Sequence, residues 1–245
     1  MDRAVARWTL DDVAAAASAA AADLAPRVPL DRLLTALPVQ AMTRLLGVPA
    51  GEIDATVDAV HAFTQAIAAG ASAHVIEHAQ GAVGLLMAQG EREGLDRVQA
   101  ANRIALMQQS LDATAGLLGN TLLALRKVRA PATMDAMRAF VHAVSRRDPA
   151  VHNTRRFAAR DLTLAGERIA RGQGVLLVLA AAQRPFGGRR HGCPGDRIAI
   201  EIVAAGAVSM RLEGIFSSEV ARWAGRFRPL PNARIPVFDR TAERL

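Results

Sequence analysis

The sequence contains one cysteine, Cys193, no tyrosine and few other aromatic residues. A single cysteine excludes an intramolecular disulfide and a cysteine-rich zinc or iron–sulfur site, and it is typical of proteins of the reducing cytoplasm. The shortage of aromatic rings argues against nucleic-acid binding, because single strands bind largely by stacking their bases on such rings. Helix-turn-helix and zinc-finger spacings are also absent from the sequence. We therefore expect a cytoplasmic protein without a nucleic-acid partner.

Long apolar runs are also missing. The longest, residues 175–182, is far shorter than the ~20 residues that a membrane-spanning helix needs. Residues 1–22 carry acidic and basic side chains ahead of a polyalanine stretch, which is the wrong order for a signal peptide. We expect neither secretion nor a membrane anchor.

The positive charge is unevenly distributed. Of 245 residues, the first 125 hold 8 basic and 13 acidic side chains, whereas the remainder hold 22 and 10. Only Lys127 is a lysine, so the charge is carried by guanidinium groups, which suit carboxylates and phosphates. This pattern indicates an anionic ligand or partner. The abundance of alanine and arginine is typical of a bacterium with a GC-rich genome.

The first half of the chain has the periodicity of helices almost throughout. Thr9, with Asp12 three residues later, resembles a capping box that opens a helix through Ala22. One unusually long helix, which contains Gly116 and Gly119, is predicted over residues 96–127, where no proline occurs. The other predicted helices cover residues 30–36, 39–46, 53–68 and 73–89.

The second half changes character after Pro131. A helix is predicted over residues 134–145, and Asp148-Pro149 ends it, because the residue before proline avoids the helical region. Strands are predicted at 157–164 and 169–179, a compact loop at 185–195, a helix at 196–211 and a hairpin-like finish at 227–238. We predict a mainly α fold with a small β region and a single domain, 1–245, with a helical part at 1–130 and a loop-and-strand part at 131–245.

The loop Pro-Phe-Gly-Gly-Arg-Arg-His-Gly-Cys-Pro-Gly, residues 185–195, holds the densest group of reactive side chains. A following helix N-terminus and nearby arginines are expected to favour the thiolate form of Cys193. Such a thiolate serves as a nucleophile or as an axial ligand of haem iron. A buried, unreactive cysteine is the other interpretation of the same residues.

This loop resembles the haem-binding signature of the cytochrome P-450 superfamily, Phe-x-x-Gly-x-(Arg/His)-x-Cys-x-Gly. Four positions match and Arg189 stands where the pattern has glycine, beside Gly188. The segments 151–161, 166–179 and 230–236 resemble the family's strands and carboxy-terminal finish, and residues 112–125 resemble its oxygen-binding helix. The matching loop residues are Phe186, His191, Cys193 and Gly195.

The resemblance implies haem b as the cofactor, with the Cys193 thiolate as axial ligand of its iron. His191 and Arg156 would contact the haem propionates. Phe186 would pack beside the sulfur, while Gly187 and Gly195 let the backbone approach closely.

On the opposite face of the haem, the resemblance implies roles for Asp112 as an acid and Thr114 as a hydroxyl. Ala113 replaces the threonine that usually helps to deliver protons to bound oxygen. Thr114 stands one position further, about 100° around the helix.

Other departures from the family concern the proximal side. Ala143 stands in place of the glutamate of the Glu-x-x-Arg pair, while Arg146 remains. Gln183-Arg184 continues directly into Pro185, so the family's meander is missing, as is its amino-terminal part. We expect a trimmed cytochrome P-450-like fold built around a long central helix and a cysteine-ligand loop. Its exposed apolar surface would be covered by a second copy or another protein.

The activity implied by the resemblance is monooxygenation of a small organic substrate with dioxygen and external electrons. NAD(P)H through an acidic ferredoxin would supply these, and the arginines of 155–171 and 184–197 would dock the ferredoxin or form a solvated face. Two alternatives remain open: a degenerate relative that acts as a partner-binding or scaffold subunit, and a haem enzyme with non-oxygenase chemistry.

A competing motif is His74-x-x-Glu77-His78, which has the spacing of a zinc protease. Because no third ligand is evident, we interpret these residues as a surface face of a helix.

Overall fold

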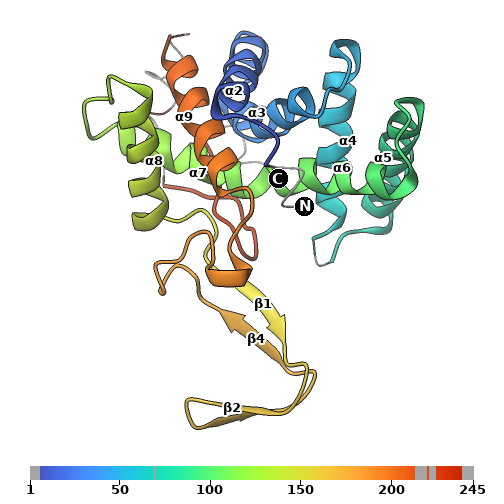
Figure 1. Ribbon diagram of the computed structural model, residues 1–245, viewed down its shortest axis with the longest axis vertical. Helices are drawn as coiled ribbons and strands as arrows, with labels where there is room; N and C mark the ends of the chain where they lie inside the picture. The colour runs from blue at the N-terminus through green and yellow to red at the C-terminus, as the bar shows by residue number, and fades with distance from the viewer. Residues whose placement is uncertain (1–5, 69, 213–219, 221–224, 239–245) are drawn as a thin grey trace.

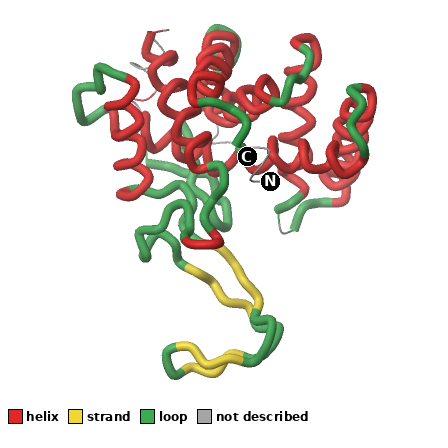
Figure 2. The backbone as a smooth tube through the Cα atoms, viewed as in Figure 1, coloured by secondary structure: helices red, strands yellow, loops and turns green. Residues whose placement is uncertain are grey.

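The computed structural model describes residues 6–68, 70–212, 220 and 225–238, with only the backbone of Arg189 and Leu212. Helices form one body, and a narrow β arm projects from it (Figures 1 and 2). The helices are α2 (Leu10–Leu24), α3 (Leu30–Leu45), α4 (Ile53–Ala66), α5 (Ala73–Arg92), α6 (Arg97–Gln109), α7 (Leu111–Leu125), α8 (Met134–Arg147) and α9 (Asp196–Leu212), with short 3₁₀ turns at Ala50–Glu52 and Arg189–His191. The prediction of a mainly α fold with a small β region is confirmed.

Helix α7 lies at the centre of the body and packs against α3, α8 and α9. Its residues from Thr114 to Leu122 are all buried. The two glycines in this stretch allow a close approach: a Cβ on Gly116 would lie 2.4 Å from the carbonyl oxygen of Arg234, and one on Gly119 would lie 2.6 Å from Pro236. The chain near the carboxy terminus therefore rests directly on α7.

The single helix predicted over residues 96–127 is wrong, because it is interrupted at Ser110. The Ser110 hydroxyl donates a 2.7 Å hydrogen bond to the carbonyl of Met107. Its backbone N–H is shared between the carbonyls of Leu106 and Met107, at 3.3 and 3.2 Å. A serine that bonds back to the preceding turn competes with the regular ladder, and this local competition separates α6 from α7.

The two short helices predicted around Pro38 are also wrong, since α3 continues through that proline. Proline removes one backbone hydrogen bond from a helix interior. In α3, every residue from Leu33 to Thr43 is buried, and this packing offsets the loss. By contrast, the predicted capping box is confirmed: Thr9 and Asp12 each bond the other's backbone N–H.

The arm contains two antiparallel pairs of strands. Strand β1 (Thr154–Phe157) pairs with β4 (Gly174–Leu177), and β2 (Leu162–Leu164) pairs with β3 (Glu167–Ile169) at the tip. Ala165 and Gly166 have φ of 51° and 86°, which suits the two-residue turn between β2 and β3. The predicted strands 157–164 and 169–179 are thus each divided into two shorter strands.

The hairpin-like finish is confirmed by the bridges Val151↔Ala233 and Phe227↔Pro236. The first bridge joins the chain after α8 to the segment that rests on α7, and the second closes the finish on itself. Over the described ranges, no helix has the length and apolar character needed to cross a bilayer.

An ion pair joins α8 to α9. Arg138 donates two hydrogen bonds to Glu201, of 2.6 and 2.9 Å, and one of 2.6 Å to Asp135. The Glu201 side chain is 1% exposed, whereas that of Asp135 is 92% exposed. These carboxylates raise the pKa of Arg138, chiefly through the hydrogen bonds that it donates to Glu201. The guanidinium thus neutralises a carboxylate that is fully withdrawn from water.

Replacing Arg138 by methionine should lower the free energy of unfolding by about 3–5 kcal/mol, because Glu201 then stays buried without a counter-charge. The double variant Arg138→Met/Glu201→Leu should recover most of this loss. Asp135→Asn is the matched control and should cost less than about 1 kcal/mol. Urea unfolding measures all three, and equal losses in Arg138→Met and Asp135→Asn would contradict this account.

Candidate functional site

A cavity of about 1090 Å³ lies between α7, the base of the β arm and the loop that precedes α9. All the candidate site residues identified in the sequence contribute to its lining, although they come from widely separated segments. They are Asp112, Thr114, Arg156, Phe186, Gly187, His191, Cys193 and Gly195.

The loop before α9 presents Cys193 on the cavity surface. Its thiol is exposed, and its backbone N–H donates a 2.8 Å hydrogen bond to the carbonyl of Phe186. Gly187 has φ of +72°, and a Cβ there would lie 2.6 Å from the carbonyl oxygen of His191. The loop is therefore folded back on itself in a way that only glycine permits at position 187.

The expectation that the surroundings favour the Cys193 thiolate is corrected by the structure. Desolvation raises the pKa of the thiol, the backbone N–H of Gly195 lowers it, and the neighbouring charge of Asp196 raises it again. The net direction is upward, because desolvation outweighs the hydrogen bond from the helix N-terminus. A cation bound at the sulfur would have to stabilise the thiolate.

Two hydrogen-bond donors line the same cavity near its edge. Arg156 uses Nη1 to bond the hydroxyl of Thr154 at 2.8 Å and the carbonyl of Arg155 at 2.9 Å. Its other guanidinium N–H groups have no partner within the described part of the chain. His191 is exposed beside the cysteine. Both side chains are suited to receive carboxylates.

Helix α7 forms the opposite wall with its first turn. Burial raises the pKa of the Asp112 carboxyl, while the positive charge of Arg228 opposes this shift. Thr114 is 3% exposed, and both residues contribute to the cavity surface with Ala113 between them. The structure thus brings an acid and a hydroxyl to the side of the cavity formed by α7.

The cavity also has an apolar wall. Leu176, Leu177 and Val178 line it and are 55%, 40% and 51% exposed. Exposed aliphatic side chains in a cavity of this size suit a large apolar ligand. Together with one thiol on the surface and two donors for carboxylates, this donor set fits a haem group.

Two further features were not anticipated from the sequence. Glu201, which pairs with Arg138, lies in α9 and is separated from it by 63 positions. Asn120 in α7 donates a 2.9 Å hydrogen bond to the carbonyl of Asp148 and so holds the chain after α8. A polar residue within an apolar helical stretch, as at Glu201 and Asn120, indicates a buried hydrogen bond. The sequence does not identify the partner, because the partner is distant in the chain.

The zinc-like motif stays on the surface. His74 and His78 are exposed on α5, and the described residues contain no group of three metal-ligating side chains.

Substituting Gly187 by alanine should open the cysteine loop, because the left-handed conformation and the clash with the His191 carbonyl together cost about 1–3 kcal/mol. The chain has one cysteine, so reaction with a thiol-specific disulfide reagent reports on this loop alone. We expect the rate to rise several-fold in Gly187→Ala.

The matched control is Gly188→Ala, because a Cβ there would meet only Arg184 Nη1, at an ordinary 3.8 Å. Its rate should stay at the wild-type value. Equal rates in both variants and the wild type would show that the turn does not hold the loop.

Neither a protein-family model nor a curated protein sequence matches the chain. Solved structures do. The cytochrome P-450 RauA, solved with a biosynthetic intermediate of aurachin RE, has a TM-score of 0.73 at 17% identity, over 96% of this chain and 72% of that chain. P-450 BioI in complex with an acyl carrier protein bearing hexadec-9Z-enoic acid has a TM-score of 0.72 at 19% identity, over 93% and 72%.

A third neighbour, CYP109E1 from Bacillus megaterium in complex with corticosterone, has a TM-score of 0.68 at 17% identity, over 96% of this chain and 77% of that chain. At these identities the likeness concerns the fold. The chain therefore has the cytochrome P-450 fold, as the cysteine loop and the segments around it predicted.

Proposed function

We propose that this protein is a haem-thiolate oxidoreductase that monooxygenates a small organic substrate. The observation that carries the proposal is the cavity itself, in which the Cys193 thiol shares one surface with Asp112 and Thr114 of α7. A degenerate relative with the same fold but no haem site would not require a thiol, an acid and a hydroxyl to line the same cavity.

The residues of the cysteine loop would hold haem b. Cys193 would ligate the iron, and the hydrogen bond from its N–H to the Phe186 carbonyl would fix the direction of the sulfur. His191 and Arg156 would bind the two propionates, with Phe186 beside the sulfur and Gly195 close to it. Bound there, haem supplies the activation of dioxygen by an electron-rich iron centre.

The residues of α7 would hold and transfer protons. The Asp112 carboxyl has a raised pKa and lies on the cavity, so it retains a proton at higher pH than an exposed aspartate does. Thr114 offers a hydroxyl one position after Ala113, about 100° around the helix, where Ala113 itself has none. This pair would deliver protons toward the substrate side of the cavity.

External electrons would come from NAD(P)H through an acidic ferredoxin. The exposed Arg155, Arg184, Arg190 and Arg197 surround the cysteine loop and its base, and complementary charge accelerates such encounters. We propose the cytoplasm as the location, on the cysteine usage described above. The ligands of RauA and CYP109E1 support a small organic substrate as a class.

Non-oxygenase haem chemistry is the second candidate, and Ala113 is the observation that favours it. A methyl group at this position cannot relay protons, and dehydration or rearrangement reactions do not require proton delivery to dioxygen. The substrate-dependent consumption of NAD(P)H and oxygen, with a ferredoxin and its reductase, separates the two candidates, since only the oxygenase consumes both.

The first experiment is the absorption spectrum of haem-loaded protein that has been reduced under carbon monoxide. The wild type should show the red-shifted Soret band of a thiolate-ligated carbonyl complex, and Cys193→Ala should lose it. His191→Ala is the control and should keep the band while it binds haem more weakly. Retention of the band in Cys193→Ala, or a folded wild type that takes up no haem, would refute the proposal.

A further inference from the structure

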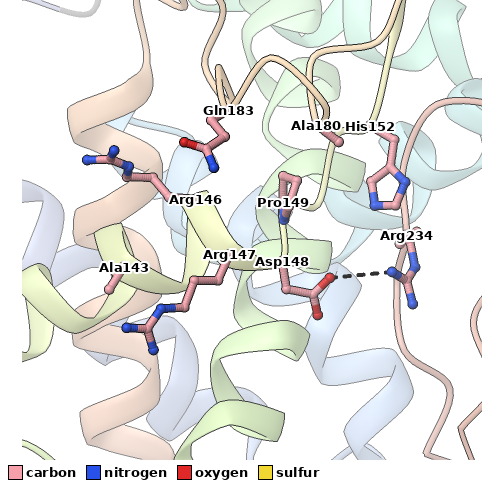
Figure 3. A pocket seen from close by; sticks show the side chains of 9 residues that line it. All are labelled: Ala143, Arg146, Arg147, Asp148, Pro149, His152, Ala180, Gln183 and Arg234. Atoms are coloured by element: carbon pink, nitrogen blue, oxygen red, sulfur yellow. Dashed lines mark hydrogen bonds and ion pairs between the residues drawn. The ribbon is translucent and has the colours of Figure 1, made fainter.

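A second cavity, of about 710 Å³, lies at the carboxy-terminal end of α8 (Figure 3). Its wall combines the end of that helix with the chain after it, the turn before the cysteine loop and one residue of the segment on α7. The lining residues are Ala143, Arg146, Arg147, Asp148, Pro149, His152, Ala180, Gln183 and Arg234. None of them belongs to the lining of the larger cavity.

Positive charge dominates this wall. Three arginines and one carboxylate line it: the Asp148 carboxylate is paired with Arg234 at 3.4 Å, whereas the Arg146 and Arg147 side chains extend away from Asp148 (Figure 3). Arg146 and Arg147 form no hydrogen bond or ion pair with any residue of the described ranges. Two arginines at the cavity thus have no counter-charge among the residues that the structure describes.

A buried polar atom points to the same conclusion. His152 Nε2 is withdrawn from solvent and has no hydrogen-bond partner among the described residues. The histidine backbone is fixed on both sides: its N–H donates to Asn232 at 2.9 Å, and its carbonyl accepts from Ala180 at 3.1 Å. Leaving such an atom unpaired is unfavourable, so a ligand that forms a hydrogen bond with it is stabilised.

The wall is held in place by α7. Asn120 bonds the carbonyl of Asp148 at 2.9 Å, and the N–H of Arg234 bonds the carbonyl of Ala150 at 2.8 Å. The close approach at Gly116 leaves Arg234 no room to move toward the helix. The backbone of this wall is therefore held in place before a ligand binds, which limits the entropy that binding costs.

We propose that this cavity is a binding site for a small anion with at least two negative charges, a phosphate ester or a polycarboxylate. Arg146 and Arg147 supply the charge on one side, and His152 and Arg234 supply donors on the other. Guanidinium groups bind both ligand classes through paired N–H donors. The proposal does not depend on haem binding, because the two cavities are lined by different residues.

The test is calorimetric titration of the full-length protein with pyrophosphate and, separately, with citrate, with sodium chloride added to keep the ionic strength constant. One or both anions should bind, and the better one identifies the ligand class. Arg146→Gln and Arg147→Gln should each weaken binding about tenfold, the value of one charged hydrogen bond. His152→Phe should weaken it as well.

Arg160→Gln is the matched control, because this exposed arginine lies on the arm away from the cavity. It should leave the affinity within twofold of the wild type. Circular dichroism checks folding, which is not at risk at the exposed positions 146 and 147. No binding of either anion at millimolar concentration, or an equal loss in Arg160→Gln, would overturn the proposal.

Discussion

Contact between α7 and the segment 233–236 is the constraint on which both cavities depend. A Cβ at Gly116 would lie 2.4 Å from a backbone oxygen, and one at Gly119 would lie 2.6 Å from a proline ring, so neither position accepts a side chain without movement of the chain. Residues 232–234 in turn pair with residues 150–152: the Arg234 N–H bonds the Ala150 carbonyl, and the His152 N–H bonds the Asn232 carbonyl. The central helix therefore sets the position of the β arm's base.

One thin wall separates the two cavities. Val151 and Asn153 line the larger one, and His152 between them lines the smaller one. The same division occurs in the turn before the cysteine loop, where Arg184 faces one cavity and Gln183 the other. Because the lining residues alternate in this way, the cationic cavity lies directly behind the wall of the cysteine cavity.

Local signals in the sequence predicted a large part of this arrangement. The cap at Thr9 and the stop at Asp148-Pro149 depend on neighbouring residues alone. The cysteine loop was recognisable because its glycines and its cysteine must stand at fixed spacings to fold back as they do. Its residues share one cavity with Asp112 and Thr114, which the resemblance had also indicated.

What the sequence did not predict depends on distant partners. The burial of α3 outweighs the effect of Pro38, and desolvation of the Cys193 thiol has a larger effect on its pKa than the hydrogen bond from the N–H of Gly195. Likewise, Ser110 interrupts a stretch whose composition is helical throughout. The pairing of Arg138 with Glu201 and the second cavity arise only when α8, α9 and the carboxy-terminal segment come together. The sequence pattern of a single helix or strand does not predict contacts between elements that are distant in the chain.

The central claim is that the Cys193 sulfur binds iron in the larger cavity. X-ray absorption at the iron edge of the haem-loaded ferric protein tests this ligation directly, without dependence on turnover or on a redox partner. The account predicts one sulfur scatterer in the first coordination shell, in addition to the porphyrin nitrogens. A shell made only of nitrogen and oxygen would contradict it.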